Sequence, residues 1–303
     1  MYDYMNMKIF GVVVIIITII VAGVIYQIQS EEQKQSKLDL FFEKTQIELE
    51  EKQNSDDVYV YPPEFFELFH VYVHKNQLRV NSDETQSPEI LNFIPKMELK
   101  QTFGEIGLFD KSQNTVVIIP IFTANAYKVP SFYNYYDGSC SEICLTVSIQ
   151  NRTSGFTSSN NGVKILKLLQ YEMITDVDVD KNPDILKKYD KIILLHNEYV
   201  TKKQFDAITS HPNVIYLYPN ALYAEIETDY EKNTMTLKKG HDYPEKNIKN
   251  GFGWEYDNSP MEYDQDCSKW EFYPINNGWM LNCYPEDTLL INNEEFLKQL
   301  KEF

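Results

Sequence analysis

The stretch that decides the fold is KIILLHNEYVTKKQFDAITSHPNVIYLYPN, residues 191–220. It contains two short apolar runs, KIILL and NVIYLY, separated by a segment in which the apolar residues have helical spacing, TKKQFDAITSH. A strand, a helix and a strand in this order indicate a parallel unit with a right-handed crossover. Thr201 stands where the N-cap of that helix is expected. The stretch therefore predicts an α/β fold.

The same alternation extends over residues 115–226. The expected strands are TVVIIPIF, LTVSI and MITDVDV, and the expected helices are GVKILKLLQYE and PDILKKY. The strands are almost continuously apolar, as is typical when helices cover both faces of a parallel sheet. We therefore expect residues 115–226 to form a parallel α/β core with helices on both faces.

The flanking segments have different patterns. Residues 58–114 contain short alternating runs such as FHVYVH and QLRV, which predict a small β-rich antiparallel unit. Residues 227–303 are aromatic, acidic and rich in Gly and Asn, and we expect an irregular β-rich cap that ends in a short helix, NEEFLKQLKEF. Residues 27–57 are charged and rich in Gln, which indicates a partly helical stalk.

The N-terminal segment carries an apolar run without charge, residues 9–26. Eighteen helical residues at about 1.5 Å each nearly cross a hydrocarbon core of about 30 Å. Lys8 precedes the run and Glu31 and Glu32 follow it, so the positive-inside rule predicts a single-pass anchor in the cell membrane, with residues 1–8 in the cytoplasm and the rest outside. A cleaved signal peptide is the alternative, but no A-x-A cleavage site follows.

Four cysteines form two local pairs, Cys140 with Cys144 and Cys267 with Cys283. Outside the cytoplasm this pattern predicts two disulfides. A zinc site is the alternative, although the spacing matches no common zinc arrangement. Asn151 begins the glycosylation sequon NRT, which also fits an exported domain.

The charge of the chain limits its partners. The formal net charge is −17, and no cluster of Lys and Arg is longer than two residues. Binding to nucleic acid or to an anionic lipid surface is therefore not expected. The 22 Tyr and 17 Phe indicate folded structure and supply many phenols for a core or a site.

Polar residues follow the expected strands. In open α/β sheets, ligands bind outside the carboxyl ends of the strands. An imidazole, a carboxylate, an amide and a phenol at one sheet edge could bind a hard metal ion or perform acid–base chemistry, although such residues are also common as turn formers and helix caps. The residues in question are His196 and Glu198 after KIILL, Asn220 after NVIYLY, Thr123, Asn125 and Tyr127 after TVVIIPIF, and Asp178 and Asp180 at the end of MITDVDV.

Two other kinds of site have little support in the sequence. Asp176, Asp178 and Asp180 alternate on one face and are expected to be solvated, and the segment lacks the Gly and the late Glu of a calcium loop. No G-x-S-x-G elbow is present, and YPNALYA has no cysteine where class I glutamine amidotransferases place their nucleophile.

Three segments together resemble the large-subunit catalytic region of N,N-dimethylformamidase and its relatives. In that family an H-x-E-Y-W-[ST] segment is followed by a helix, a strand and G-G-N-x-x-Y, and a T-W-Q-A-Y-N segment lies upstream. The resemblance covers about residues 115–226, and LLHNEYVTKKQFDAI, VIYLYPNALYAE and FTANAYK carry it. The matching residues are His196, Glu198 and Tyr199, then Asn220 and Tyr223, and upstream Thr123, Ala126 and Tyr127.

The resemblance implies a flavodoxin-like or glutamine-amidotransferase-like fold and a mononuclear iron held by two tyrosines and a glutamate. Carried over, Glu198 and Tyr127 are metal ligands, and His196 and Asn220 act on the attacking water and on the amide carbonyl. SFYNYYDG offers Tyr133, Tyr135 and Tyr136 as the second tyrosine, and we take Tyr133.

The chain also departs from the family. It has Val200 and Ala124 in place of two tryptophans, and Tyr218 and Pro219 in place of the paired glycines. Iron-dependent hydrolysis of a small amide is therefore our first hypothesis. The alternative is a cell-surface binding or envelope protein that kept the fold and lost the chemistry, with a protein or glycan partner.

Overall fold

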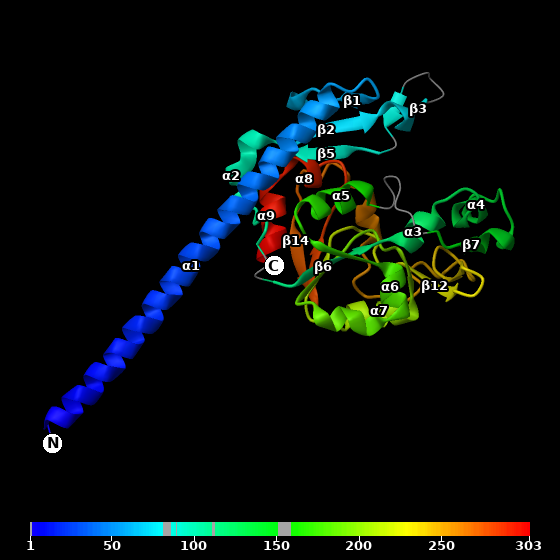
Figure 1. The fold of residues 1–303 in the computed structure, drawn as a ribbon. Coiled ribbons are helices and arrows are strands. Elements are labelled where there is room, and N and C mark those ends of the chain that lie inside the picture. Colours follow the sequence, from blue (N-terminus) through cyan, green and yellow to red (C-terminus); the bar gives the residue numbers. More distant parts are fainter. Residues whose placement is uncertain (1, 81–85, 89, 111–112, 151–158) are drawn as a thin grey trace.

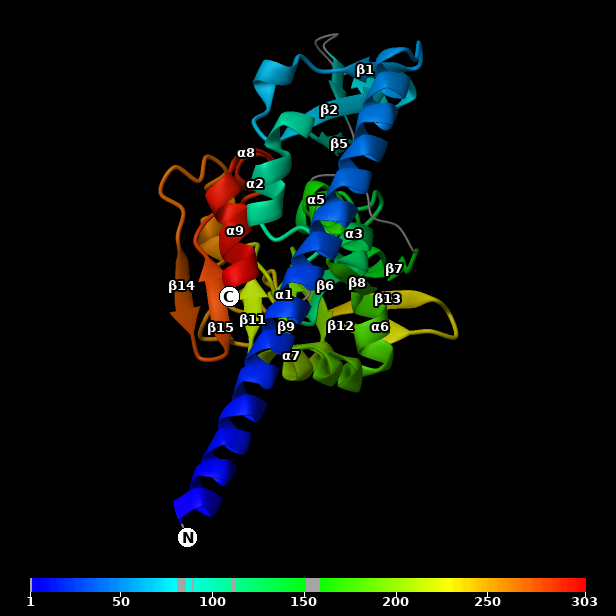
Figure 2. The ribbon, with the colours of Figure 1, turned by 60° about the vertical axis from the view of Figure 1, so that its left-hand side comes forward.

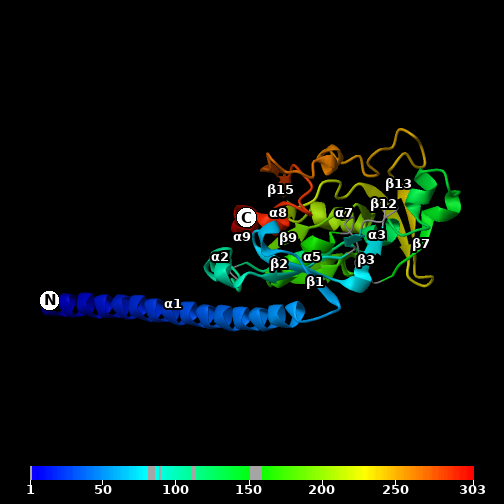
Figure 3. The same cartoon turned by 90° about the horizontal axis from the view of Figure 1, so that it is seen from above.

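The structure is a computed structural model that describes residues 2–80, 86–88, 90–110, 113–150 and 159–303 of the 303-residue chain, without the side chains of residues 2–19, 79–80 and 86–87. It begins with one long helix, α1 (Tyr2–Gln53). Figure 1 shows that the second half of α1 packs beside the rest of the molecule, whereas its first half projects away. Figure 3, seen from above, shows the same helix along one side of the body.

The main sheet has six strands in the order β14 (Phe272–Ile275), β15 (Gly278–Leu281), β11 (Val214–Tyr216), β9 (Lys191–Leu194), β6 (Thr115–Ile119) and β8 (Glu172–Thr175). The five strands from β15 to β8 are mutually parallel, and β14 pairs antiparallel with β15 at one edge. The predicted parallel α/β core is therefore confirmed.

Helices cover both faces of this sheet because alternate strand residues point to opposite sides. Val117, Ile193 and Ile215 face one core together with α5 (Asn160–Leu168), α8 (Leu289–Asn292), α9 (Glu294–Glu302) and the second half of α1. Residues 116, 192 and 214 face a second core with α6 (Asp176–Lys181) and α7 (Lys202–Thr209). In Figure 1 these two groups of helices lie on opposite sides of the sheet.

A second, four-stranded sheet lies beside the first. Its order is β10 (Tyr199–Thr201), β12 (Ala224–Asp229), β13 (Thr234–Lys239) and β7 (Thr146–Ser148). It packs against α3 (Ile121–Ala126) and α4 (Phe132–Tyr136). The sequence prediction placed LTVSI in the parallel sheet. That placement was wrong, since β7 pairs antiparallel with β13.

The small antiparallel unit predicted before residue 115 is present. It consists of β1 (Val58–Val60), β2 (Phe69–His74) and β5 (Asn92–Pro95), with the hairpin β3 (Leu78–Val80) and β4 (Gln86–Pro88) beside it and α2 (Lys100–Glu105) after it. Figure 2 shows this unit against the end of α1. The short 3-10 helices are η1 (Pro63–Phe65), η2 (Lys75–Gln77), η3 (Met97–Leu99), η4 (Glu142–Leu145), η6 (Pro183–Lys188) and η7 (Ser259–Tyr263).

Two further expectations differ from the structure. The segment 227–303 is not only a cap, because β14 and β15 complete the main sheet and α8 and α9 cover one of its faces. MITDVDV is not one strand either. Thr175 accepts a hydrogen bond from the Asp178 N–H at 3.1 Å and the Asp178 carboxylate accepts one from the Thr175 N–H at 2.9 Å, and this capping box begins α6.

In the segment expected to form a stalk, residues 27–53 are helical. Leu38 and Phe42 are nevertheless buried in the main core, so this part of α1 belongs to the folded body. Within the described part of the chain, we find no helical segment with both the length and the apolar character that a bilayer crossing requires. Most of the expected membrane span, residues 9–19, lies outside the described side chains, so the anchor stays a prediction.

Both predicted disulfides are formed, Cys140–Cys144 and Cys267–Cys283. The zinc alternative is therefore wrong, because bridged cysteines have no thiolate to offer a metal ion. The sequon residue Asn151 lies outside the described residues.

Candidate functional site

The site lies where the order of the parallel strands reverses. From β6 the chain goes to β8 on one side and then crosses to β9 on the other side. The loops after β6 and β9 therefore leave the sheet in opposite directions, and a crevice opens at their carboxyl ends. A cavity of about 640 Å³ is found there.

The structure brings together at this cavity the five residues that the resemblance assigns to catalysis and metal binding. Tyr127 follows α3, Tyr133 lies on α4, His196 follows β9 and Asn220 follows β11, and all four line the cavity. Glu198 lies behind them with no exposed surface. Residues that are distant in the sequence therefore share one site because their strands are neighbours.

Three oxygen-bearing side chains form the centre of the site. The Tyr133 hydroxyl donates to the Tyr127 hydroxyl at 2.6 Å and lies 3.5 Å from Glu198 Oε1. The two phenol rings stack with their centroids 4.2 Å apart. The other tyrosines of α4 make other contacts, since the hydroxyl of Tyr136 pairs with that of Tyr199 and the ring of Tyr135 packs on Tyr243.

Buried hydroxyls hold the strand-end loop that carries His196 and Glu198. The Glu198 N–H donates to Thr123 Oγ1 at 3.0 Å, and the His196 N–H donates to Ser159 Oγ at 3.0 Å. As a result His196 Nε2 lies 3.7 Å from Glu198 Oε2, and His196 Nδ1 lies 3.4 Å from the Tyr284 hydroxyl. Thr123 thus positions the loop and does not line the cavity.

His241 is a member of the site that the sequence analysis did not single out. Its Nε2 lies 2.5 Å from Glu198 Oε1, and its ring stacks between those of Tyr136 and Tyr199 at centroid distances of 4.9 and 5.6 Å. It comes from a turn after β13, in a segment without any sequence periodicity. Tyr284 was also missed, although the rule of strand carboxyl ends would have found it if β15 had been assigned to the sheet.

The surroundings shift the acid–base properties of these groups. Burial by itself raises the pKa of Glu198, but His241 outweighs this effect, helped by His196 and Tyr127, and the carboxyl pKa is held below its usual value. Burial and the nearby Glu198 charge raise the pKa of Tyr127 and of Tyr133. Without a bound cation both phenols therefore stay neutral, and Glu198 is the ionised group.

Asn220 presents its side chain to the cavity from a left-handed backbone conformation, with a φ of 64°. Asparagine tolerates this conformation better than most residues. Its N–H donates to Asn258 Oδ1 at 3.3 Å, and only 2% of the residue is exposed. No described residue donates a hydrogen bond to Asn220 Oδ1 or to Glu198 Oε2. Both buried oxygens can therefore accept hydrogen bonds from a ligand or, for the carboxylate, bind a cation.

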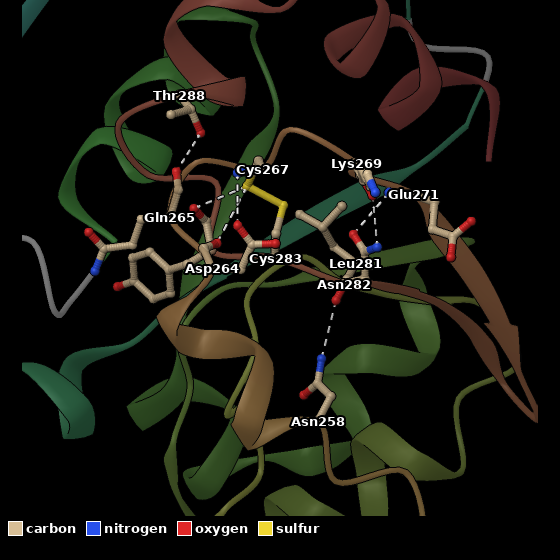
Figure 4. The surroundings of a disulfide bond; sticks show 11 residues. Asn258, Asp264, Gln265, Cys267, Lys269, Glu271, Leu281, Asn282, Cys283 and Thr288 are labelled. Atoms are coloured by element: carbon tan, nitrogen blue, oxygen red, sulfur yellow. Dashed lines mark hydrogen bonds between the residues drawn. A yellow bond between two sulfur atoms is a disulfide. The ribbon is translucent and has the colours of Figure 1, made fainter.

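The outer wall of the cavity is η7 together with Gln265 and Tyr284. Figure 4 shows how the Cys267–Cys283 disulfide fastens this wall to the end of β15. The Cys267 N–H donates to Asp264 Oδ1 at 3.1 Å, and Asn258 Nδ2 donates to the Leu281 carbonyl at 3.2 Å (Figure 4). The disulfide is therefore part of the architecture of the site.

Other polar strand-end residues have structural roles. The side-chain amide of Asn125 donates hydrogen bonds to the carbonyls of Ile121 and Gln150. Asp178 belongs to the capping box that begins α6. Asp176 and Asp180 are both buried, so the expectation that they are solvated was wrong. Asp180 accepts hydrogen bonds from three hydroxyls of the second sheet and its hairpin. Those donors are Thr201, Thr228 and Tyr230, at 2.6, 2.8 and 2.7 Å.

The residues present fit a hard metal ion in their chemistry, since carboxylate and phenol oxygens are hard donors. Among the described residues, no three His, Cys, Asp or Glu side chains are arranged to hold a metal, so any such site depends on the tyrosines. Neither Tyr218 nor Trp254, the two large side chains that could have filled the crevice, lines the cavity. Comparison with known proteins gives no match, either to a family model or to a curated protein.

Proposed function

We propose that the chain is an extracytoplasmic, membrane-anchored hydrolase of small amides that uses a metal ion, with iron as the first candidate. The observation that carries this proposal is the trio of Tyr127, Tyr133 and Glu198, whose oxygens meet beside His196 and Asn220 at one cavity. It is the combination expected from the resemblance to N,N-dimethylformamidase.

The strand order supports the finer assignment of the fold. Numbered along the chain, the five parallel strands β6, β8, β9, β11 and β15 are arranged in the order 2-1-3-4-5. This is the order of flavodoxin-like sheets, whose ligands bind at the switch point between the first and third strands. The candidate site occupies the corresponding position between β6 and β9.

Tyr127, Tyr133 and Glu198 would hold the ion. When bound, a ferric ion supplies a Lewis acid that polarises an amide carbonyl and acidifies water. Glu198 is already ionised. The two phenols can lose their protons to the solvent when the cation binds, because a nearby positive charge lowers the pKa of a phenol.

The remaining residues would serve the reaction directly. His196 lines the cavity, and its ring is fixed by Tyr284 on one side and Glu198 on the other, so it can accept a proton from the attacking water and return it to the leaving amine. The carboxamide of Asn220 can bind and orient the substrate amide through hydrogen bonds. Asn258 and the left-handed turn at residue 220 hold the backbone that carries this carboxamide.

Two features support the proposed location. Both disulfides are of a kind that persists in oxidising compartments. In addition, Ile20, Val21, Val24 and Ile25 of α1 are each at least half exposed. A contiguous exposed apolar surface is typical of a membrane or protein contact, and it continues the apolar run of residues 9–19.

The test is the metal content and visible absorbance of the purified full chain after reconstitution with iron. We expect about one iron per chain and a tyrosinate-to-iron charge-transfer band. Tyr133→Phe should weaken iron binding at least tenfold and shift the band, whereas Tyr135→Phe, a matched change on the same helix, should leave both unchanged. Glu198→Ala should abolish binding.

The absence of bound iron after reconstitution, or equal effects of the two tyrosine variants, would overturn the metal proposal. The protein would then be better described as a non-catalytic surface protein that uses the cavity for binding.

A further inference from the structure

The cavity wall has an unusual composition of charges and rings. Among the described residues that line the cavity there is no lysine or arginine. Glu262 contributes a carboxylate at the outer wall, and five tyrosine rings surround the space, from residues 127, 133, 223, 263 and 284. An anionic ligand would meet no fixed cationic side chain at this mouth.

Several carboxylates act electrostatically on the groups that line the cavity. Tyr223 is surrounded by the carboxylates of Asp257, Glu198, Asp242 and Glu262, and burial together with these charges raises its pKa to about 12. Within the described part of the chain, the charged groups that act on Glu262 are Glu198, His196 and His241. Both imidazoles also lie beside Glu198, with His196 Nε2 at 3.7 Å and His241 Nε2 at 2.5 Å from its carboxylate oxygens, so Glu262 shares these two groups with a second carboxylate.

The side chain of Asn220 offers a hydrogen-bond acceptor to the cavity. Asn220 is almost fully buried, and its Oδ1 receives no hydrogen bond from a described residue. A ligand amide N–H at this position would satisfy it. The cavity thus offers an amide-binding inner end and an acidic, aromatic outer end.

We propose that the preferred substrates are small amides that carry a cationic ammonium group, with the amide at Asn220 and the ammonium between the Glu262 carboxylate and the rings of Tyr223 and Tyr263. The inference rests on the proposed function, and it names the substrate class. A quaternary ammonium is attracted both by a carboxylate and by the negative face of an aromatic ring. The cavity volume of about 640 Å³ lies in the range of small-molecule sites, about 300–1,000 Å³.

The experiment compares two amides of the same shape. Trimethylammonioacetamide and 3,3-dimethylbutanamide differ in one atom, a cationic nitrogen in place of a neutral carbon. Binding of each to the full chain is measured by isothermal titration calorimetry, with and without iron. We expect the cationic amide to bind at least tenfold more tightly than the neutral one.

Variants identify the groups responsible. Glu262→Gln should remove most of the preference, and Tyr263→Leu, at an 81% exposed position where folding is not at risk, should reduce it severalfold. Glu255→Gln is the matched control, since it removes the same charge from an exposed residue that does not line the cavity.

Each result has a definite meaning. Equal affinities for the two amides, or a preference that survives Glu262→Gln, overturn the inference. Iron content measured on the same samples separates the two proposals. Iron binding with equal amide affinities rejects only the substrate class, whereas a cation preference without iron binding rejects only the metal.

Discussion

Glu198 is the residue on which the site depends. It has no exposed surface, and the described partners of its carboxylate are two imidazoles and two phenols. A buried carboxylate without a close opposite charge would be expensive, by several kcal/mol. His241, which comes from the turn after β13, offsets that cost.

This pairing makes a prediction for stability. In the folded state the pKa of Glu198 is lowered, so its ionised form stabilises the protein above the unfolded pKa of about 4.3, and this contribution is lost as the pH falls through the folded pKa. The substitution His241→Asn removes the imidazole that lowers the pKa of Glu198. Burial then has the largest effect on this pKa and raises it. We expect the variant to lose about 3 kcal/mol at pH 7 and less toward pH 4, where Glu198 takes up a proton.

Urea unfolding of the metal-free protein between pH 4 and pH 7.5 measures this loss. The control is the same substitution in a Glu198→Gln background, where the loss should be small and independent of pH. A loss that is the same at every pH in both backgrounds would show that His241 acts only through packing.

At the scale of elements, η7 together with Gln265 and Tyr284 forms the outer wall of the cavity. Hydrogen bonds hold it at Asp264 and Asn258, and one disulfide closes it over a sequence separation of 16. Closing a loop of about 15 residues stabilises a protein by about 3 kcal/mol, because the unfolded chain loses freedom. The Cys140–Cys144 bridge spans only 4 residues and should contribute less.

We therefore expect the double variant Cys267→Ser/Cys283→Ser to lose about 3 kcal/mol in the free energy of unfolding, measured in urea without reductant. Amide hydrogen exchange in residues 259–265 should accelerate as the wall loosens. Cys140→Ser/Cys144→Ser is the matched control and should have a smaller effect on both measurements. Equal effects of the two double variants would contradict this account of the wall.

At the scale of the whole molecule, α1 combines two different surfaces. Its second half buries Leu38 and Phe42 in the main core, whereas residues 20–28 expose apolar side chains to solvent. Burial in the core fixes one half of the helix to the body, and the exposed apolar side chains of residues 20–28 form a surface of the kind that contacts a membrane or another protein. A membrane is the partner that the apolar run suggests.

The full chain is therefore expected to remain with the membrane fraction after a carbonate wash. A chain that begins at Glu31 should be released and should keep the same melting temperature, because it retains Leu38 and Phe42. Release of the full chain by carbonate would contradict the anchor. A large drop in the melting temperature of the shortened chain would mean that the first half of α1 also stabilises the body.

The sequence by itself determined those features that depend on local order. The strand–helix–strand pattern of residues 191–220 predicts the parallel core, and the rule of strand carboxyl ends places His196, Glu198, Asn220 and Tyr127 at one edge before any coordinates are known. The two disulfides were also predictable, because each joins cysteines that are near in the sequence. In MITDVDV the alternation of apolar and polar residues predicts a strand, whereas the capping box from Thr175 to Asp178 predicts the start of a helix. The structure has the helix.

Only the tertiary structure decided which distant segments complete the core and the site. Contacts between residues far apart in the chain determine which strands pair with β7 and β15. Such contacts also bring His241, Glu262 and Tyr284 to the cavity. The segment that carries His241 and Glu262 has no periodicity, so nothing local indicates which way their side chains point. The physical reason is that burial and charge pairing act between elements, and the sequence pattern records only the preferences within each element.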